Sequence, residues 1–103
     1  MNVKVFLRPR ADQVIDEQAL YIAAHSSVGM GQRFYHSIQE TLNLLATHPS
    51  LGTKTHFQNV HLKGTRFFPV KSFEHHILFY KQTPRGLDVL RIVHGARDME
   101  HLF

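Results

Sequence analysis

The segment HHILFYKQTPRGLDVLRIVH, residues 75–94, decides the fold. Two runs of bulky and β-branched residues, 75–82 and 87–94, flank residues 83–86, which read Thr-Pro-Arg-Gly. Proline and glycine favour a turn, so the segment is predicted to form two antiparallel strands with a short connection. The residues from Ile77 to Tyr80 are all apolar, as expected for a strand covered on both faces, and this strand is therefore predicted to be central in its sheet.

Two amphipathic helices are predicted upstream of these strands. Apolar residues recur every three or four positions between residues 11 and 23 and again between residues 30 and 45, which is the spacing of one helix face. Residues 25–29 separate the two patterns, and Gly29-Met30-Gly31 is interpreted as part of the turn. The second helix is predicted to end at HPSLG, residues 48–52, because the residue before a proline avoids the helical region. Helices joined by so few residues lie antiparallel, as a hairpin.

The remaining segments complete an α+β fold. VKVFL, residues 3–7, and TRFFPV, residues 65–70, are predicted to be strands, whereas residues 53–64 are polar and irregular. The predicted order is β-α-α-β-β-β, in which an antiparallel sheet packs against the helical hairpin. DMEHLF, residues 98–103, predicts a short C-terminal helix or tail. A chain of this length, 1–103, is expected to form a single domain.

Composition excludes several classes of protein. The sequence contains no cysteine, which excludes a disulfide framework and a thiolate metal site. No apolar run approaches the roughly 18 residues that cross a membrane, and the start MNVKVFLRPR is too short and too charged for a signal peptide. We therefore expect a cytoplasmic protein that does not enter the membrane. Nine histidines are scattered without a zinc-binding motif, so neither a metal nor a cofactor is expected.

The charge of the chain is distributed unevenly. The formal net charge is +2 over residues 1–8, −2 over residues 9–52 and +4 over residues 53–103. A concentration of basic residues in the first strand and the C-terminal half predicts an anionic partner, either an acidic protein or a nucleic acid. A soluble surface with a basic bias is the alternative interpretation.

Four segments that together span nearly the whole chain carry a family resemblance. They are ADQVIDEQALYIA (11–23), LLATHPSLG (44–52), RFFPVKSFEHHILFYK (66–81) and VLRIVHGARD (89–98). In this order they resemble the ParE/RelE superfamily of toxins from bacterial toxin–antitoxin pairs. The resemblance implies a small cytoplasmic toxin that a co-expressed antitoxin holds inactive. It also implies a hetero-oligomer with the antitoxin, which reaches operator DNA only through the antitoxin.

The superfamily contains two activities that need different groups. RelE-like members cleave messenger RNA on the ribosome, and they usually use an arginine on the middle strand, another after the last strand and a tyrosine near the C-terminus. ParE-like members bind DNA gyrase and block it. Here Arg97 matches the second position, but the middle-strand position falls near the apolar Ile77, and Phe103 has no proton to give. The resemblance therefore favours a ParE-like gyrase inhibitor without catalytic residues.

Two alternatives remain open. Histidine titrates in a useful range, so His94 and Arg97 would carry the catalysis if the chain were a RelE-like endoribonuclease. The other alternative is a degenerate toxin that only binds its antitoxin. Whatever the activity, Gly95 is predicted to turn the backbone off the last strand, because glycine adopts positive φ without a steric penalty.

Two sets of binding residues are predicted from the resemblance and the charge pattern. The residues expected to touch the target are Arg91, His94, Arg97 and Phe103. The residues expected to touch the antitoxin are Tyr35, Arg66, Lys71 and Arg91. The three cations of the second set are interpreted either as a basic stripe on the open face of the sheet, which would meet an acidic segment of the antitoxin, or as separate solvated residues.

Overall fold

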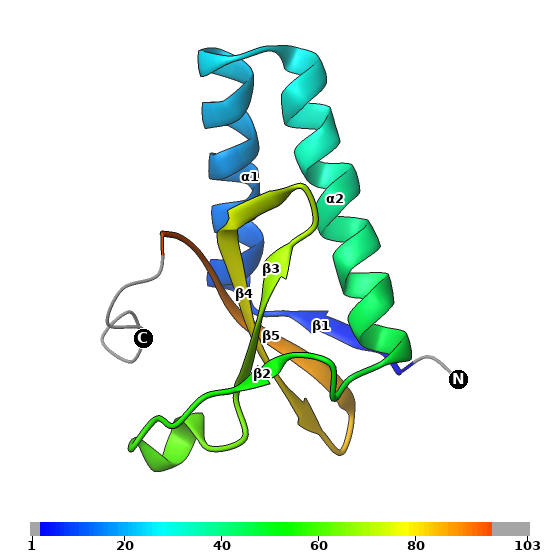
Figure 1. Cartoon of the computed structure of the whole chain (residues 1–103), viewed down its shortest axis with the longest axis vertical. Helices are drawn as coiled ribbons and strands as arrows, with labels where there is room; N and C mark the ends of the chain where they lie inside the picture. Colours follow the sequence, from blue (N-terminus) through cyan, green and yellow to red (C-terminus); the bar gives the residue numbers. More distant parts are fainter. Residues whose placement is uncertain (1–2, 96–103) are drawn as a thin grey trace.

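The computed structural model describes residues 3–95 (Figure 1). In chain order its elements are β1 (Val5–Leu7), α1 (Pro9–His25), α2 (Val28–Thr47), β2 (Thr53–Lys54), the 3-10 helix η1 (Val60–Leu62), β3 (Arg66–Val70), β4 (Phe73–Thr83) and β5 (Gly86–His94). The α+β class and the β-α-α-β-β-β order are confirmed. The short elements β2 and η1 are additions within the segment predicted to be irregular. The predicted C-terminal helix or tail lies outside the described residues.

The two helices form the predicted hairpin, but its turn is shorter than predicted. Ser27 starts α2, because its Oγ accepts a hydrogen bond from the backbone N of Met30 at 3.1 Å. The interpretation of Gly29-Met30-Gly31 as part of the turn is therefore wrong, since all three residues lie within α2. A Cβ at Gly31 would lie 2.9 Å from the carbonyl oxygen of Ala19, so glycine allows α1 and α2 to pack closely here. Neither helix is long and apolar enough to span a bilayer.

The sheet has five strands in the order β1-β5-β4-β3-β2. Strands β3, β4 and β5 form an antiparallel meander with β4 in the centre, as predicted. Strand β1 runs parallel to β5, so the sheet is mixed, and the prediction of an antiparallel sheet is wrong for this strand. Three residues carry too little pattern to determine which strand they join, or in which direction.

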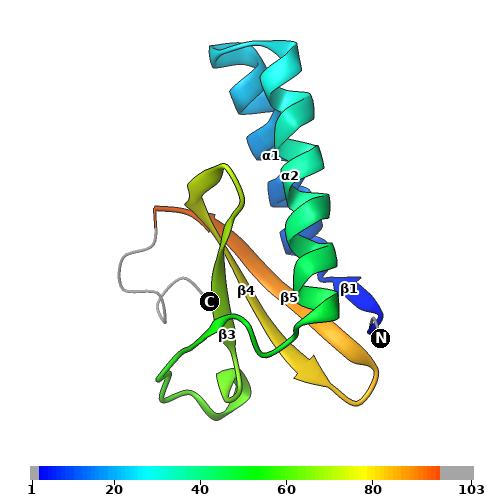
Figure 2. The same ribbon diagram turned by 45° about the vertical axis from the view of Figure 1, so that its right-hand side comes forward.

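Both helices pack against the same face of the sheet (Figure 2). Residues paired across neighbouring strands point to the same face. On the face toward the helical hairpin, β4 and β5 contribute Leu78, Tyr80, Leu87, Val89 and Ile92 to one core with residues of α1 and α2. Because side chains alternate along a strand, the intervening residues of β4 and β5 point to the opposite face, here called the open face.

A β-bulge keeps β5 aligned with this core. Tyr80 pairs with Val89, whereas Phe79 pairs with Arg91, so Leu90 is an extra residue in β5. Val89 and Ile92 are three positions apart and would otherwise point to opposite faces. The extra residue lets both side chains enter the core, because a bulge shifts the alternation by one position.

Tyr80 ties the sheet to the segment after α2. Its hydroxyl donates to the carbonyl oxygen of Pro49 at 2.8 Å and accepts from the backbone N of Gly52 at 2.8 Å. A side chain on Gly52 would collide with this hydroxyl. Burial raises the pKa of Tyr80, so the hydroxyl remains protonated and able to donate.

Replacing Tyr80 with phenylalanine should destabilise the fold, because the Pro49 carbonyl and the Gly52 amide lose their partner. We expect the free energy of unfolding in urea to fall by about 1–3 kcal/mol. The matched control is Tyr21→Phe, since Tyr21 is 59% exposed and the change there should be below about 0.5 kcal/mol. Equal losses in the two variants would contradict the role given to the Tyr80 hydroxyl.

Candidate functional site

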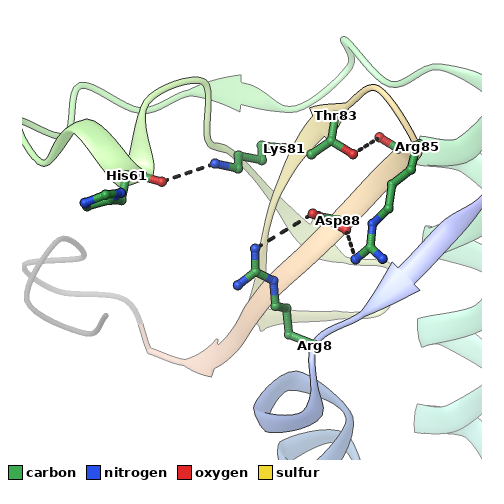
Figure 3. Close-up of polar contacts among 7 residues, drawn as sticks. Arg8, His61, Lys81, Thr83, Arg85 and Asp88 are labelled. Atoms are coloured by element: carbon green, nitrogen blue, oxygen red, sulfur yellow. Dashed lines mark hydrogen bonds and ion pairs between the residues drawn. The ribbon is translucent and has the colours of Figure 1, made fainter.

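A buried carboxylate holds two arginines on the open face of the sheet (Figure 3). Asp88 lies in β5, in register with Lys81 of β4 and Phe6 of β1. Its side chain is only 7% exposed. Oδ1 accepts a hydrogen bond from Arg85 at 2.9 Å, and Oδ2 lies 3.8 Å from a guanidinium nitrogen of Arg8. The two guanidinium groups flank the carboxylate and offset its charge, which would be costly to bury alone.

The cations around this carboxylate remain accessible. The side chains of Arg8 and Arg85 are 53% and 59% exposed. The guanidinium of Arg85 lies 4.0 Å above the centre of the Phe6 ring, in cation–π geometry. Lys81 donates from Nζ to the carbonyl oxygen of His61 at 3.2 Å. Arg8, Lys81, Arg85 and Asp88 are together called the Asp88 cluster, and it carries three cations against one carboxylate.

Local sequence brings the cluster together. Gly86 has a φ of 144° and lies so close to the carbonyl of Lys4 that a side chain would collide with it. This allows Leu87 to donate from its backbone N to the Lys4 carbonyl at 2.8 Å, which docks β1 against β5. The end of β1 then delivers Arg8 to Asp88, while the turn between β4 and β5 supplies the other guanidinium.

A second polar group lies on the hairpin side of β4. His76 is 6% exposed, and its Nε2 lies 2.9 Å from Oε1 of Gln18 on α1. Its ring packs against Phe34, with ring centres 4.9 Å apart, and against His94 at 4.5 Å. Burial, together with the charges that His94 and His75 can carry, lowers the pKa of His76 to about 4. His76 is therefore a neutral, structural histidine at neutral pH.

The two predicted target-binding residues that the structure describes lie on opposite faces of the sheet. Arg91 is half-buried on the open face, whereas His94 is exposed at the end of β5 and in register with His76, on the hairpin side. Arg97 and Phe103 lie outside the described residues. The His94–Arg97 pair of the ribonuclease alternative therefore has one member whose position is described.

The last strand ends as predicted. Gly95 has a φ of 69°, and its backbone N donates to the carbonyl oxygen of His75 at 2.8 Å. Residues with side chains rarely adopt this backbone conformation. The prediction that Gly95 turns the chain off β5 is confirmed.

The interpretation of Arg66, Lys71 and Arg91 as a basic stripe is wrong. Arg66 is in register with Tyr80, so it lies on the hairpin side, where it donates to two backbone carbonyls of the segment after α2 at 2.8 and 3.2 Å. Lys71 lies in the turn between β3 and β4 and pairs with Glu40 of α2 at 2.8 Å. Of these three cations, only Arg91 lies on the open face.

Tyr35, the remaining predicted antitoxin contact, lies apart from these cations on α2. It is 45% exposed, and its hydroxyl donates to Oδ1 of Asp16 on α1 at 2.6 Å. This hydrogen bond is the main cause that raises the pKa of Tyr35. Its ring also borders a small apolar hollow between the two helices. Tyr35 is available to a partner of the hairpin, but it does not share a surface with Arg91.

A larger apolar groove, of about 580 Å³, lies between α2 and the turn of β3 and β4. Leu44, Phe68 and Pro69 contribute to its lining, and the Lys71–Glu40 ion pair lies at its rim. The hydrogen bond from Lys71 lowers the pKa of Glu40. The groove offers apolar contact with a charged rim, which suits the side chains of a partner better than proton transfer.

Sequence reasoning missed the Asp88 cluster, although one signal was present. Asp88 interrupts an otherwise apolar strand, and a buried carboxylate needs a cation nearby. Arg85, three residues earlier in the predicted turn, was the obvious partner. Arg8 could not have been found in this way, because the parallel pairing of β1 with β5 was not predicted.

Within residues 3–95, no three side chains of the metal-binding types lie close enough to hold a metal ion. The Asp88 cluster is also unsuited to one, since its single carboxylate is flanked by guanidinium groups that repel a cation.

Comparison with known proteins identifies the family of this fold. The family model of the ParE toxin of the type II toxin–antitoxin system, parDE, matches residues 5–99. The chain belongs to the ParE toxin family. A solved chain described as the chromosomal ParDE TA system from P. aeruginosa has the same fold, with a TM-score of 0.75 and 11% sequence identity. The similarity covers 91% of this chain and 97% of that chain. The comparison with curated proteins gave no match.

The ParE match spans both helices, all five strands and the Asp88 cluster. It also includes Arg91, His94 and Arg97, whereas Phe103 lies beyond it. As a ParE-type toxin of a type II system, the chain belongs to a family whose members are paired with an antitoxin.

The lowered pKa of His76 predicts a pH dependence of stability. In the unfolded chain a histidine titrates near 6.5, whereas His76 titrates at about 4 in the fold, so the folded state disfavours its protonation. Its contribution is complete above about pH 6.5 and is lost as the pH falls toward 4, by about 3 kcal/mol in total. The measurement is urea unfolding at several pH values in this range.

The variant His76→Gln should have a flatter pH dependence than the parent, because it cannot take up the proton. His25→Gln is the control, since His25 is exposed at the end of α1. If His76→Gln lost stability with falling pH as steeply as the parent, the buried neutral histidine would not be the cause.

Proposed function

We propose that this ParE toxin acts in the cytoplasm by inhibiting DNA gyrase, and that its antitoxin neutralises it. The observation that carries the proposal is the match of the ParE family model over residues 5–99, which includes the ending VLRIVHGARD. Inhibition would arrest growth when the antitoxin is lost. Toxin and antitoxin would form a hetero-oligomer that reaches operator DNA through the antitoxin.

The middle strand supports inhibition by binding rather than RNA cleavage. Ile77 lies in the centre of the sheet, in register with Pro69 on one side and Val93 on the other. These apolar neighbours provide no cation to stabilise charge on a phosphate at the position where RelE-like nucleases use an arginine. The nearby His76 is held against Gln18 and is neutral at neutral pH, so it is poorly placed as a catalytic acid.

The target is tested by asking which process the purified toxin stops. We expect loss of gyrase supercoiling of relaxed plasmid, while messenger RNA remains intact in a ribosome-containing translation extract. Both reactions are followed on gels with the same toxin preparation. Codon-dependent cleavage of the message with normal supercoiling would reject the gyrase proposal and favour the ribonuclease.

Arg97 is the residue proposed to be most important for toxicity, because a guanidinium can bind a carboxylate or phosphate through two parallel hydrogen bonds. We expect Arg97→Ala to abolish growth arrest, and Arg97→Lys to be partly active because lysine keeps the charge but loses the fork. Toxicity is measured by induced expression, with thermal melting of each variant as control. A drop in melting temperature as large as that expected for losing about 2 kcal/mol would instead make Arg97 a structural residue.

A further inference from the structure

We propose that the Asp88 cluster and the apolar strip beside it on the open face form the docking surface for an acidic segment of the antitoxin, in which carboxylates are followed by apolar side chains. The inference rests on the proposed pairing with an antitoxin and adds the place and chemistry of the contact. It replaces the sequence-based expectation, because Arg66 lies on the hairpin side and Lys71 lies in the turn between β3 and β4, so neither shares the open face with Arg91.

The cluster presents its guanidinium groups in a fixed arrangement. Asp88 lies between Arg8 and Arg85 (Figure 3). The Phe6 ring lies 4.0 Å below the Arg85 guanidinium and supports it. Both side chains are more than half exposed, at 53% and 59%, so each fork retains N–H groups for an incoming ligand. Arginine forks match carboxylates geometrically, and side chains that are already held in place lose less freedom on binding.

An apolar strip continues the open face from this cluster toward the end of β5. Phe67 pairs with Phe79, and Pro69 and Val93 both pair with Ile77, so these side chains share the face with Asp88. Phe79 is fully buried and stacks against the Phe57 ring of the segment after β2, with ring centres 6.2 Å apart. The other members of the strip are half-buried. The open face is therefore cationic at one end and apolar at the other. It fits a segment that carries carboxylates at one end and apolar side chains at the other.

This division favours an acidic protein over a nucleic acid. A nucleic acid carries a charge on every nucleotide, and its binding surfaces follow the backbone with a track of cations. Among the described open-face residues of β3, β4 and β5, Lys81 and Arg91 are the cations and Asp88 is the carboxylate. The row past Arg91, formed by Pro69, Ile77 and Val93, is apolar and offers no track of cations. A short acidic segment needs only the cationic end, and its apolar continuation would cover the strip.

The charge of α1 makes it a poorer site for such a segment than the Asp88 cluster. The first half of α1 carries the carboxylates of Asp12, Asp16 and Glu17, which would repel an acidic partner. The Asp88 cluster attracts it.

The test uses two probes of equal charge with the full-length chain. The first is a fluorescein-labelled peptide with a block of glutamates followed by a block of leucines, and the second is a labelled deoxythymidine oligonucleotide. Binding is measured by fluorescence anisotropy at low and at physiological salt. We expect the peptide to bind more tightly than the oligonucleotide, with an affinity that weakens as salt rises.

The variant pair Arg8→Ala/Arg85→Ala should weaken peptide binding by about tenfold, as expected for the loss of two exposed charge-assisted contacts. The pair Arg33→Ala/Lys54→Ala removes the same formal charge from exposed sites on α2 and β2, and it should change the affinity by less than about twofold. Equal weakening by the two pairs would reduce the interaction to general charge attraction and overturn the proposal. Tighter binding of the oligonucleotide, or no binding of the peptide, would also overturn it.

The alanine pair leaves Asp88 without partners and could unfold the chain, so a second pair keeps the charge. Arg8→Lys/Arg85→Lys should fold and should bind the peptide a few times more weakly than the parent, because lysine lacks the fork. Unchanged affinity in this pair would reject the fork geometry. The supercoiling assay contains no antitoxin, so failure of peptide binding would leave the gyrase result standing, and failure of gyrase inhibition would leave the peptide result standing.

Discussion

Burial of Leu78, Tyr80 and Ile92 against the helical hairpin is the interaction on which the rest of the structure depends. Side chains alternate along a strand, so burial of these residues in the core also determines which residues lie on the open face. A slip of one position would move Lys81 and Asp88 into the core, where their charges would be costly. The bulge at Leu90 allows both Val89 and Ile92 of β5 to point into the core while Arg91 points to the open face.

Much of this fold could be predicted from local patterns. The helical hairpin and the β3–β4–β5 meander follow from spacing, from the Thr83–Gly86 turn and from the HPSLG stop, all of which act over a few residues. The parallel pairing of β1 with β5 could not be predicted, because it joins the two ends of the chain through backbone hydrogen bonds that any residue type can make. The N-cap of α2 at Ser27 was also not predicted, and Gly31 was therefore assigned to the turn instead of to α2.

The functional residues were harder to predict than the fold. Arg66 and Lys71 are basic residues of the kind found on binding surfaces, but the face of the sheet on which a strand residue lies depends on strand register. In the structure, both side chains bind other segments of the chain. In the sequence, Asp88 is an isolated charged residue within an apolar strand. In the structure, it holds the exposed guanidinium groups of Arg8 and Arg85 in place. Charge totals indicated an anionic partner but not a location, since a location requires tertiary contacts.

The open face, rather than the hairpin side, is the surface proposed to meet the acidic segment of the antitoxin. The most direct test is to follow the Nε–Hε NMR signals of Arg8, Arg85 and Arg66 in the full-length toxin while the glutamate–leucine peptide is added. The signals of Arg8 and Arg85 should shift and reach saturation together, and the signal of Arg66 should stay in place. A shift of Arg66 with Arg8 and Arg85 unchanged would contradict the account.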